Sequence, residues 1–363
     1  MPVPLDEFPV HQVPLSMEYV AAGDRNFYDR CYFGGHDRSG DVFFLTGLGV
    51  YPNLGVKDAY ATIRRGDDQW SVRYSDALDE DRLHPHVGGY RIAVEEPLQR
   101  IHLECGGDDL EFDLTWEGAF PATHEGHHFS RNGRRATIDA SRFAQVGSWR
   151  GAIWVAGEEL LVDPATWVGV RDRSWGLRPI GEPEPPGRFA GTFQGFWWVY
   201  VQLRFDDFAV LVQVQEDPDG HRTHNDAVRV WGDGRCEQLG WPELDIDYRS
   251  GTRHPEHATL HLGPRRAPVT IEIDTMLAIS LQIGAGYGSA RDWKHGQWKG
   301  DAWSECVRYD HTDPDLRKRF YAGNVDHSCR AVCDGAEGWG LFEHASVGRH
   351  DPSGFADFRA VAP

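Results

Sequence analysis

The chain has 363 residues, which favours two domains of about 180 residues, each large enough to bury its own core. With 14 Trp, 18 Phe and 41 Gly but only 3 Met, the composition is typical of proteins built from strands and turns. The formal net charge of −19 would repel phosphate backbones and anionic lipid headgroups, so we expect no nucleic-acid partner.

The cysteines and the apolar runs indicate the cellular compartment of the protein. The six cysteines form no CxxC pair, and no secretory segment follows the first residues. No apolar run approaches the roughly 20 residues that a membrane helix needs. We therefore expect a cytoplasmic protein with reduced thiols and no integral membrane segment. The sequence gives no indication of its oligomeric state.

From Asp41 onward, apolar and aromatic stretches alternate with turn residues, as expected for successive antiparallel strands. Residues 59–63 and 69–75, joined by an Arg-Gly-Asp-Asp turn, predict a hairpin. Residues 90–96, 98–105 and 110–118 continue as a meander, because their separators are too short for crossover helices. A helix is predicted only near residue 315.

The second half has the same character. Along residues 197–205, Trp197, Val199, Val201, Leu203 and Phe205 fall on one face of a strand, and Trp198, Tyr200, Gln202 and Arg204 on the other. Residues 258–281 predict another hairpin, and 340–348 a last strand. The stretch at 179–191 is rich in Pro and Gly and suits a connection between domains. We predict an all-β protein of two antiparallel barrel-like domains, residues 1–180 and 181–363.

The segment His-Glu-Gly-His-His at 124–128 matches the HExxH pattern of zinc metalloproteases. That pattern requires a helix. Here Phe120-Pro121 precedes it, Gly126 lies inside it, and a polar Gly-containing stretch follows, which favours a turn between strands. We therefore expect no metal, with the histidines at a pocket mouth or on a solvated loop.

The segment Gly-Ala-Gly-Tyr-Gly at 284–288 resembles a dinucleotide-binding loop in its glycines. The residues after it lack helical spacing, and no βαβ pattern surrounds it, so a strand bend or bulge is the better interpretation. We expect no nicotinamide or flavin, and no cofactor of any other kind.

The densest group of unusual residues lies at 167–181, where Asp172 is bracketed by Arg171, Arg173 and Arg178. A carboxylate clamped by guanidinium groups stays ionised and has a structural role. In an aromatic pocket its pKa rises, and it can donate a proton. These residues alone leave both interpretations open.

Asp-Arg-Ser-Trp-Gly at 172–176, followed by the aromatic strand at 195–203, resembles the carotenoid 1,2-hydratase and AttH-like superfamily. The similarity in layout includes the blocks at 43–63 and 338–348. The resemblance implies two lipocalin-like β-barrel domains. It also implies proton addition by an aspartate to an isolated isoprenoid alkene, followed by water capture of the tertiary cation. Asp172 is the matching position, whereas Val170 replaces the tyrosine of the family pattern.

A carbocation is best held by aromatic faces in a dry cavity. The nearest candidates for substrate contacts are Trp175, Trp197, Trp198 and Tyr200, although the inward face of a strand is usually apolar with or without a ligand.

A second group must position water or take its proton. Asp58 and Asp301 are further catalytic candidates, and Tyr51, His36 and Glu343 are further substrate-contact candidates. Asp58 stands out because it begins a strand after a Pro-Asn-Leu-Gly turn, but such a position also suits an ordinary turn carboxylate.

The sequence thus predicts a cofactor-independent hydro-lyase that hydrates an isoprenoid or terpenoid alkene, or dehydrates the tertiary alcohol, for example a monoterpenoid such as terpineol. Its partner would be an apolar small molecule. A non-catalytic binding protein for an apolar lipid or terpenoid, and a terpenoid cyclase or isomerase, remain open. A carboxyl of Asp172 that faces an aromatic cavity would favour the enzyme, and bidentate pairs with Arg173 or Arg178 would favour a structural role.

Overall fold

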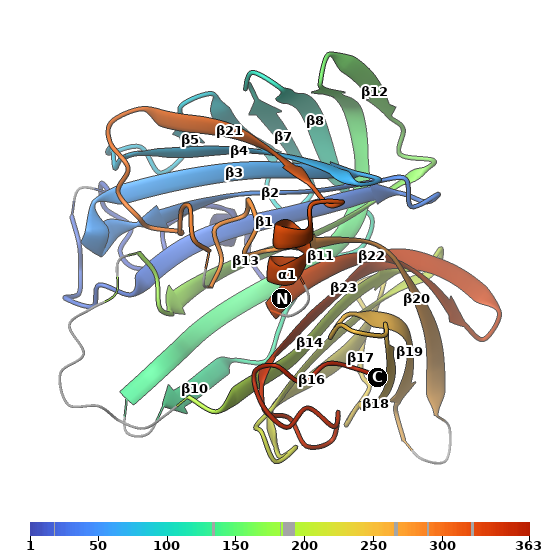
Figure 1. Cartoon of the computed structure of the whole chain (residues 1–363). Helices are drawn as coiled ribbons and strands as arrows, with labels where there is room; N and C mark the ends of the chain where they lie inside the picture. The colour runs from blue at the N-terminus through green and yellow to red at the C-terminus, as the bar shows by residue number, and fades with distance from the viewer. Residues whose placement is uncertain are drawn as a thin grey trace.

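The computed structural model describes residues 1–17, 19–132, 135–181, 183, 193–264, 268–288, 290–320 and 323–363. It consists almost entirely of two antiparallel sheets, each curled into a half-barrel (Figure 1). This confirms the predicted all-β class with two lipocalin-like halves. No helix in the described ranges is long and apolar enough to cross a membrane.

The first sheet has the strand order β21-β4-β3-β2-β1-β13-β11-β8-β7-β6-β5, and β9, β10 and β12 also pair with β11. Its strands are β1 (Phe27–Asp37), β2 (Val42–Tyr51), β3 (Val56–Arg65), β4 (Asp68–Ala77), β5 (His86–Val87), β6 (Tyr90–Glu96), β7 (Arg100–Cys105), β8 (Leu110–Gly118), β9 (Thr123–His124), β10 (His128–Asn132), β11 (Arg135–Val155), β12 (Glu158–Val162), β13 (Trp167–Leu177) and β21 (Trp303–Asp310).

The second sheet has the order β17-β16-β15-β14-β23-β22-β20-β19-β18. Its strands are β14 (Gly195–Arg204), β15 (Phe208–Glu216), β16 (Arg222–Trp231), β17 (Cys236–Gln238), β18 (Glu243–Tyr248), β19 (Pro255–Leu262), β20 (Val269–Ser280), β22 (Gly323–Cys333) and β23 (Ala336–Gly348). The helices are short: α1 (Pro314–Phe320) and the 3₁₀ helices η1 (Pro4–Glu7) and η2 (Pro52–Leu54).

The predicted hairpin of β3 and β4, the meander of β6 to β8 and the helix near residue 315 are all confirmed. The first sheet is nevertheless not contiguous in sequence. Strand β1 precedes the first predicted strand, β13 lies between β1 and β11, and β21 comes from the second half of the chain to pair with β4 (Figure 1). Most of the predicted connection at 179–191 lies outside the described residues, so the boundary near residue 180 stays a prediction.

Strand alternation divides the apolar side chains into three main cores. The first half-barrel is filled by aromatic residues that include Trp116 and Trp149, and a second cluster fills the other half-barrel. A third cluster lies where the two sheets face each other. On β14 the predicted alternation is confirmed, because Trp197 packs inside the second half-barrel while Trp198 belongs to the core between the sheets.

The N-terminal segment is tied to the first half-barrel by a buried ion pair. Nη1 and Nη2 of Arg171 donate to Oε1 and Oε2 of Glu7 at 2.8 and 3.0 Å, and both residues are almost inaccessible to solvent. Burial raises the pKa of Glu7, but the charge and hydrogen bonds of Arg171 outweigh this effect and lower it overall.

We predict that Glu7→Ala lowers the free energy of unfolding by about 3–5 kcal/mol, because the Arg171 charge would stay buried without its partner. Glu7→Ala/Arg171→Met should recover part of that loss, since neither charge then remains. The control is Glu158→Ala, which breaks an exposed pair with Arg65 and should cost at most about 1 kcal/mol. Urea unfolding of the four proteins measures this, and equal losses at Glu7 and Glu158 would contradict the buried pair.

Candidate active site between the two sheets

In the first sheet, Tyr32, Asp172 and Ala144 lie side by side on β1, β13 and β11. Tyr32 and Ala144 belong to the core between the sheets, and cross-strand partners share a face, so Asp172 also points toward the second sheet. Because Ala144 is small, it leaves space beside the carboxyl. The side chain of Asp172 accordingly keeps some accessible surface deep inside the molecule.

The second sheet presents a matching polar row. Gln213, Tyr200, Glu343 and Asp326 are cross-strand neighbours on β15, β14, β23 and β22. Strand β13 lies against β23, and β11 lies against β14, so this row faces the row that contains Asp172. The facing rows bring ionisable side chains of both halves of the chain into one region.

Two hydrogen bonds and one ion pair link these groups. The hydroxyl of Tyr32 donates to Oδ2 of Asp326 at 2.5 Å, which joins the two sheets directly. The hydroxyl of Tyr200 donates to Oε1 of Glu125 at 2.5 Å, and Nε of Arg142 lies 3.3 Å from Oε2 of Glu125. We call Asp172, Glu125, Asp326 and Glu343 the acid cluster.

Glu125 reaches the cluster because the segment between β9 and β10 extends to the second sheet. The backbone N–H of Gly126 donates to Oδ2 of Asp226 at 2.7 Å, and Nε2 of His128 lies 2.7 Å from Oε1 of Gln215. The HExxH segment is therefore not helical, as the sequence predicts. It nevertheless supplies a site residue, its glutamate.

Burial dominates the electrostatics of Asp172 and raises the pKa of its carboxyl, although the charges of Arg142, Arg30 and Arg178 oppose the rise. Within the described part of the chain, Asp172 forms no ion pair with an arginine. Arg173 lies on the opposite face of β13 and donates to Oδ1 of Asp29 at 2.7 Å. Arg178 lies over aromatic rings instead. The clamped arrangement that would favour a structural role is absent at this carboxyl.

The other acids of the cluster also retain protons more strongly than usual. Burial raises the pKa of Glu125 from 4.5 to about 7, against the opposing charge of Arg142. Burial and the neighbouring Glu343 charge raise the pKa of Asp326 well above its usual value, and burial raises that of Glu343. The charge of Asp172 contributes to the rise in all three, so these groups lie around it.

Several buried polar atoms at the cluster have no hydrogen-bond partner among the described residues. They are Oδ1 of Asp326, Oδ1 of Asn324, and both amide atoms of Gln202. Asn324 and Asp326 lie two positions apart on the same face of β22. Buried acceptors of this kind usually bind water or a ligand. The arrangement can therefore hold a water molecule next to the carboxyls.

Aromatic rings close two sides of the region. Trp198 stacks on His128 with ring centroids 5.3 Å apart, and burial lowers the pKa of His128 to about 3, so this imidazole is neutral. On another side, Tyr287 packs edge-on against Tyr60, and the guanidinium of Arg30 lies 4.5 Å from the Tyr287 ring centroid. Tyr287 belongs to the Gly-Ala-Gly-Tyr-Gly segment, which forms a turn after β20.

The structure brings four of the predicted site residues together: Asp172, Trp198, Tyr200 and Glu343. Asp58 and Tyr51 lie next to this group and support it. The hydroxyl of Tyr51 and the backbone N–H of Gly296 donate to Asp58 at 3.0 and 2.7 Å, which fixes a loop whose His295 contacts Tyr287.

The remaining predicted residues lie elsewhere. Trp175 is on the opposite face of β13 from Asp172. Its ring stacks on that of His11, with ring centroids 3.6 Å apart. Trp197 is in the core of the second half-barrel. His36 lies four residues from Tyr32 along β1, and Asp301 is exposed in the turn before β21.

Sequence reasoning missed Glu125, Arg142, Tyr32 and Asp326. Tyr32, Arg142 and Asp326 lie on β1, β11 and β22, none of which the sequence predicted as strands. For Glu125, the sequence feature that could have indicated the site is the HExxH segment, of which it is the glutamate. For Tyr32 it was the alternation of Tyr28, Arg30 and Tyr32, which marks one face of a strand.

Comparison with known proteins places this arrangement in a family. Residues 3–356 match the profile of a family of unknown function, DUF8625. The chain belongs to this family. A sequence search of curated proteins gives no match.

Two solved structures share the fold. The AttH-like protein of Nitrosomonas europaea is 12% identical, with a TM-score of 0.57 over 88% of this chain and 92% of that chain. Kievitone hydratase of Nectria haematococca is 13% identical, with a TM-score of 0.50 over 88% of this chain and 89% of that chain. The resemblance at residues 172–176 predicts an AttH-like fold, and these comparisons confirm that fold. The assignment as a carotenoid hydratase stays a prediction.

We predict that Glu125→Gln flattens the pH dependence of stability. The raised pKa of Glu125 means that the folded state holds this proton more tightly than the unfolded state between pH 4.5 and about 7. The wild-type free energy of unfolding should therefore fall as pH rises through that range, by up to about 3 kcal/mol from this group. Urea unfolding at pH 5 and pH 8 measures it, with Glu158→Gln as the exposed control. The prediction fails if Glu125→Gln shows the full wild-type fall.

Proposed function

We propose that the protein is a cofactor-independent hydro-lyase that hydrates an isoprenoid or terpenoid alkene, or dehydrates the corresponding tertiary alcohol. The observation that carries the proposal is the Asp172 carboxyl. It lies deep between the sheets, keeps accessible surface, has a raised pKa and forms no ion pair with the arginines beside it in sequence. A carboxyl in that state is protonated at a higher pH than usual and can act as a general acid.

In the forward reaction the Asp172 carboxyl donates its proton to one carbon of the alkene. The π electrons form the new C–H bond, and the other carbon becomes a tertiary cation beside the Asp172 carboxylate. The faces of Trp198 and Tyr200 can stabilise that cation. When Glu125 is ionised, its ion pair with Arg142 offsets the positive charge of that arginine, which reduces its repulsion of the cation.

Water then completes the addition. The unpartnered oxygens of Asp326 and Asn324 suit a water molecule, because the Asn324 amide oxygen accepts a hydrogen bond and the Asp326 carboxyl accepts one when ionised or donates one when protonated. The water oxygen bonds to the cationic carbon, and the proton it loses returns to the Asp172 carboxylate. Asp172 is thereby restored as the acid, and the reverse sequence gives dehydration.

A solved structure of the same fold is named a hydratase, kievitone hydratase, which supports this reaction class. The fold by itself does not imply function, so the proposal depends on the acid cluster.

The test is Asp172→Asn, which keeps the shape of the side chain but removes its acidic proton. The purified protein is incubated with a panel of terpenes and terpenoid alcohols in deuterated water, and products are identified by mass spectrometry. We expect kcat/KM on any converted compound to fall by about 10²–10⁴-fold in Asp172→Asn. Asp301→Asn is the matched control, because Asp301 is exposed in the turn before the edge strand β21, and its activity should equal that of the wild type.

Full turnover by a folded Asp172→Asn would overturn the assignment. Tight binding of panel compounds by the wild type without any conversion would instead favour the non-catalytic carrier.

The proposed role of Asp172 as the acid also predicts the direction of the pH effect: activity should fall as pH rises above the pKa of Asp172, because the proton donor is lost.

A further inference from the structure

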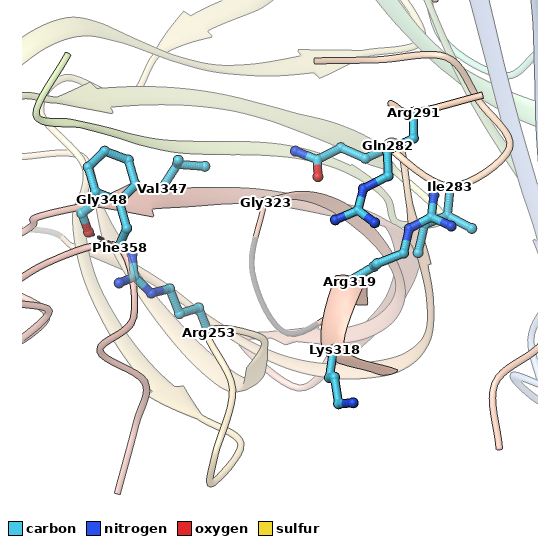
Figure 2. Close-up of a pocket in the computed structure, with 10 residues that line it drawn as sticks. All are labelled: Arg253, Gln282, Ile283, Arg291, Lys318, Arg319, Gly323, Val347, Gly348 and Phe358. Atoms are coloured by element: carbon cyan, nitrogen blue, oxygen red, sulfur yellow. Dashed lines mark hydrogen bonds between the residues drawn. The ribbon is translucent and has the colours of Figure 1, made fainter. Parts of the chain in front are cut away.

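A basic pocket of about 290 Å³ opens where β20, β22 and β23 end near α1 (Figure 2). It is lined by the cationic residues Arg253, Arg291, Lys318 and Arg319, and no carboxylate lines it within the described ranges. The whole chain carries a net charge of −19, so this concentration of positive charge runs against the overall composition. Such a site favours an anion.

Two guanidinium groups and one amide are placed to bind that anion. Figure 2 shows Arg291, Arg319 and Gln282 on one side of the pocket. Arg291 forms no hydrogen bond or ion pair with any other described residue, and Arg319 has only a long contact of 3.8 Å with Asp292. The amide of Gln282 lies beside Gly323, whose backbone φ of +121° favours a glycine at this position.

The other two cations have different roles. Arg253, on the opposite side of the pocket in Figure 2, is buried and donates to the backbone carbonyls of Gly348 and Ala360 at 2.7 Å each. It adds positive charge and fixes the wall. Lys318 is exposed and pairs with Asp315 on α1. Direct recognition therefore depends mainly on Arg291 and Arg319.

The basic pocket lies at one end of the face that carries the acid cluster. Val347 lines the pocket and points to the same side of β23 as Glu343, four residues away, a separation of roughly 13 Å along the strand. The turn after β20 connects the two places as well, because Gln282 lines the pocket while Tyr287 packs between the sheets.

We propose that the ligand of the acid cluster has an apolar body and an anionic group, a phosphate or a carboxylate, and that the basic pocket binds this group. The inference rests on the proposed function for the chemistry at the other end of the ligand. A guanidinium fork matches the oxygens of either anion, and each charge-assisted hydrogen bond is stronger than a neutral one. Holding the anion at the strand ends would place the apolar body along the face toward Asp172.

The experiment compares three ligands with the same apolar body: geranyl phosphate, geranic acid and geraniol. Binding to the full-length protein is measured by isothermal titration calorimetry. We expect at least one of the two anions to bind at least about tenfold more tightly than geraniol, a ratio within the range of one or two charge-assisted hydrogen bonds. The stronger of the two anions identifies the chemical class.

The variant Arg291→Gln/Arg319→Gln should abolish that advantage and leave geraniol binding unchanged. Arg150→Gln, an exposed arginine on β11 of the first sheet, is the control for loss of surface charge and should keep the advantage. Equal binding of geraniol and both anions, no binding of either anion, or an advantage that survives in the double variant would each overturn the inference.

Asp172→Asn separates this inference from the proposed function. Because Asp172 does not line the basic pocket, the substitution should leave the preference for the anion intact. Loss of turnover with intact anion preference supports both proposals. Full turnover in Asp172→Asn overturns the hydro-lyase alone, and missing anion preference overturns the basic pocket alone.

Discussion

Burial of ionisable carboxyls on both faces of β13 is the constraint on which the rest of this structure depends. A carboxylate loses its hydration there, and the free-energy cost is several kcal/mol unless a proton or a partner removes the charge. The protein uses both solutions on the two faces of one strand. On one face of β13, Arg171 and Arg173 are paired with Glu7 and Asp29. On the other face, Asp172 has no such pair, and its desolvation raises the pKa of the carboxyl.

That division follows from strand geometry. Successive side chains of β13 point to opposite faces, so the two arginines next to Asp172 in sequence are kept away from it in space. The neighbouring strands then place an alanine beside the carboxyl, and the facing sheet supplies Asp326 and Glu343. The filled half-barrels hold both sheets rigidly enough for these groups to stay close together.

Sequence reasoning predicted the parts of this fold in which apolar residues alternate regularly. Strands β3, β4, β6 and β14 were predicted for that reason. It did not predict β1 or β22, whose inward positions include Arg30 and Asp326, because a pattern that assumes apolar inward residues fails where charged groups are buried. The candidate site is the region in which these buried charged side chains lie close together.

The same limit explains the uneven prediction of the candidate site. Asp172 was found through a short motif, and Tyr200 through its aromatic strand. Trp175 was grouped with Asp172 because it is close in sequence, although an odd separation along a strand places the two on opposite faces. Glu125 and Tyr287 lie in segments that the sequence predicts to be non-helical, and the structure confirms this. Their positions depend on contacts across the two halves, which a single sequence does not reveal.

The hydrogen bond between Tyr32 and Asp326 joins residues that are 294 positions apart in the chain. During synthesis, all strands of the first sheet, including β21, are complete before the ribosome reaches Asp326. The acid cluster is therefore assembled only when the chain is nearly finished. A truncated or partly folded molecule would lack the environment that raises the pKa of Asp172, so the proposed activity would report on completed folding of both halves.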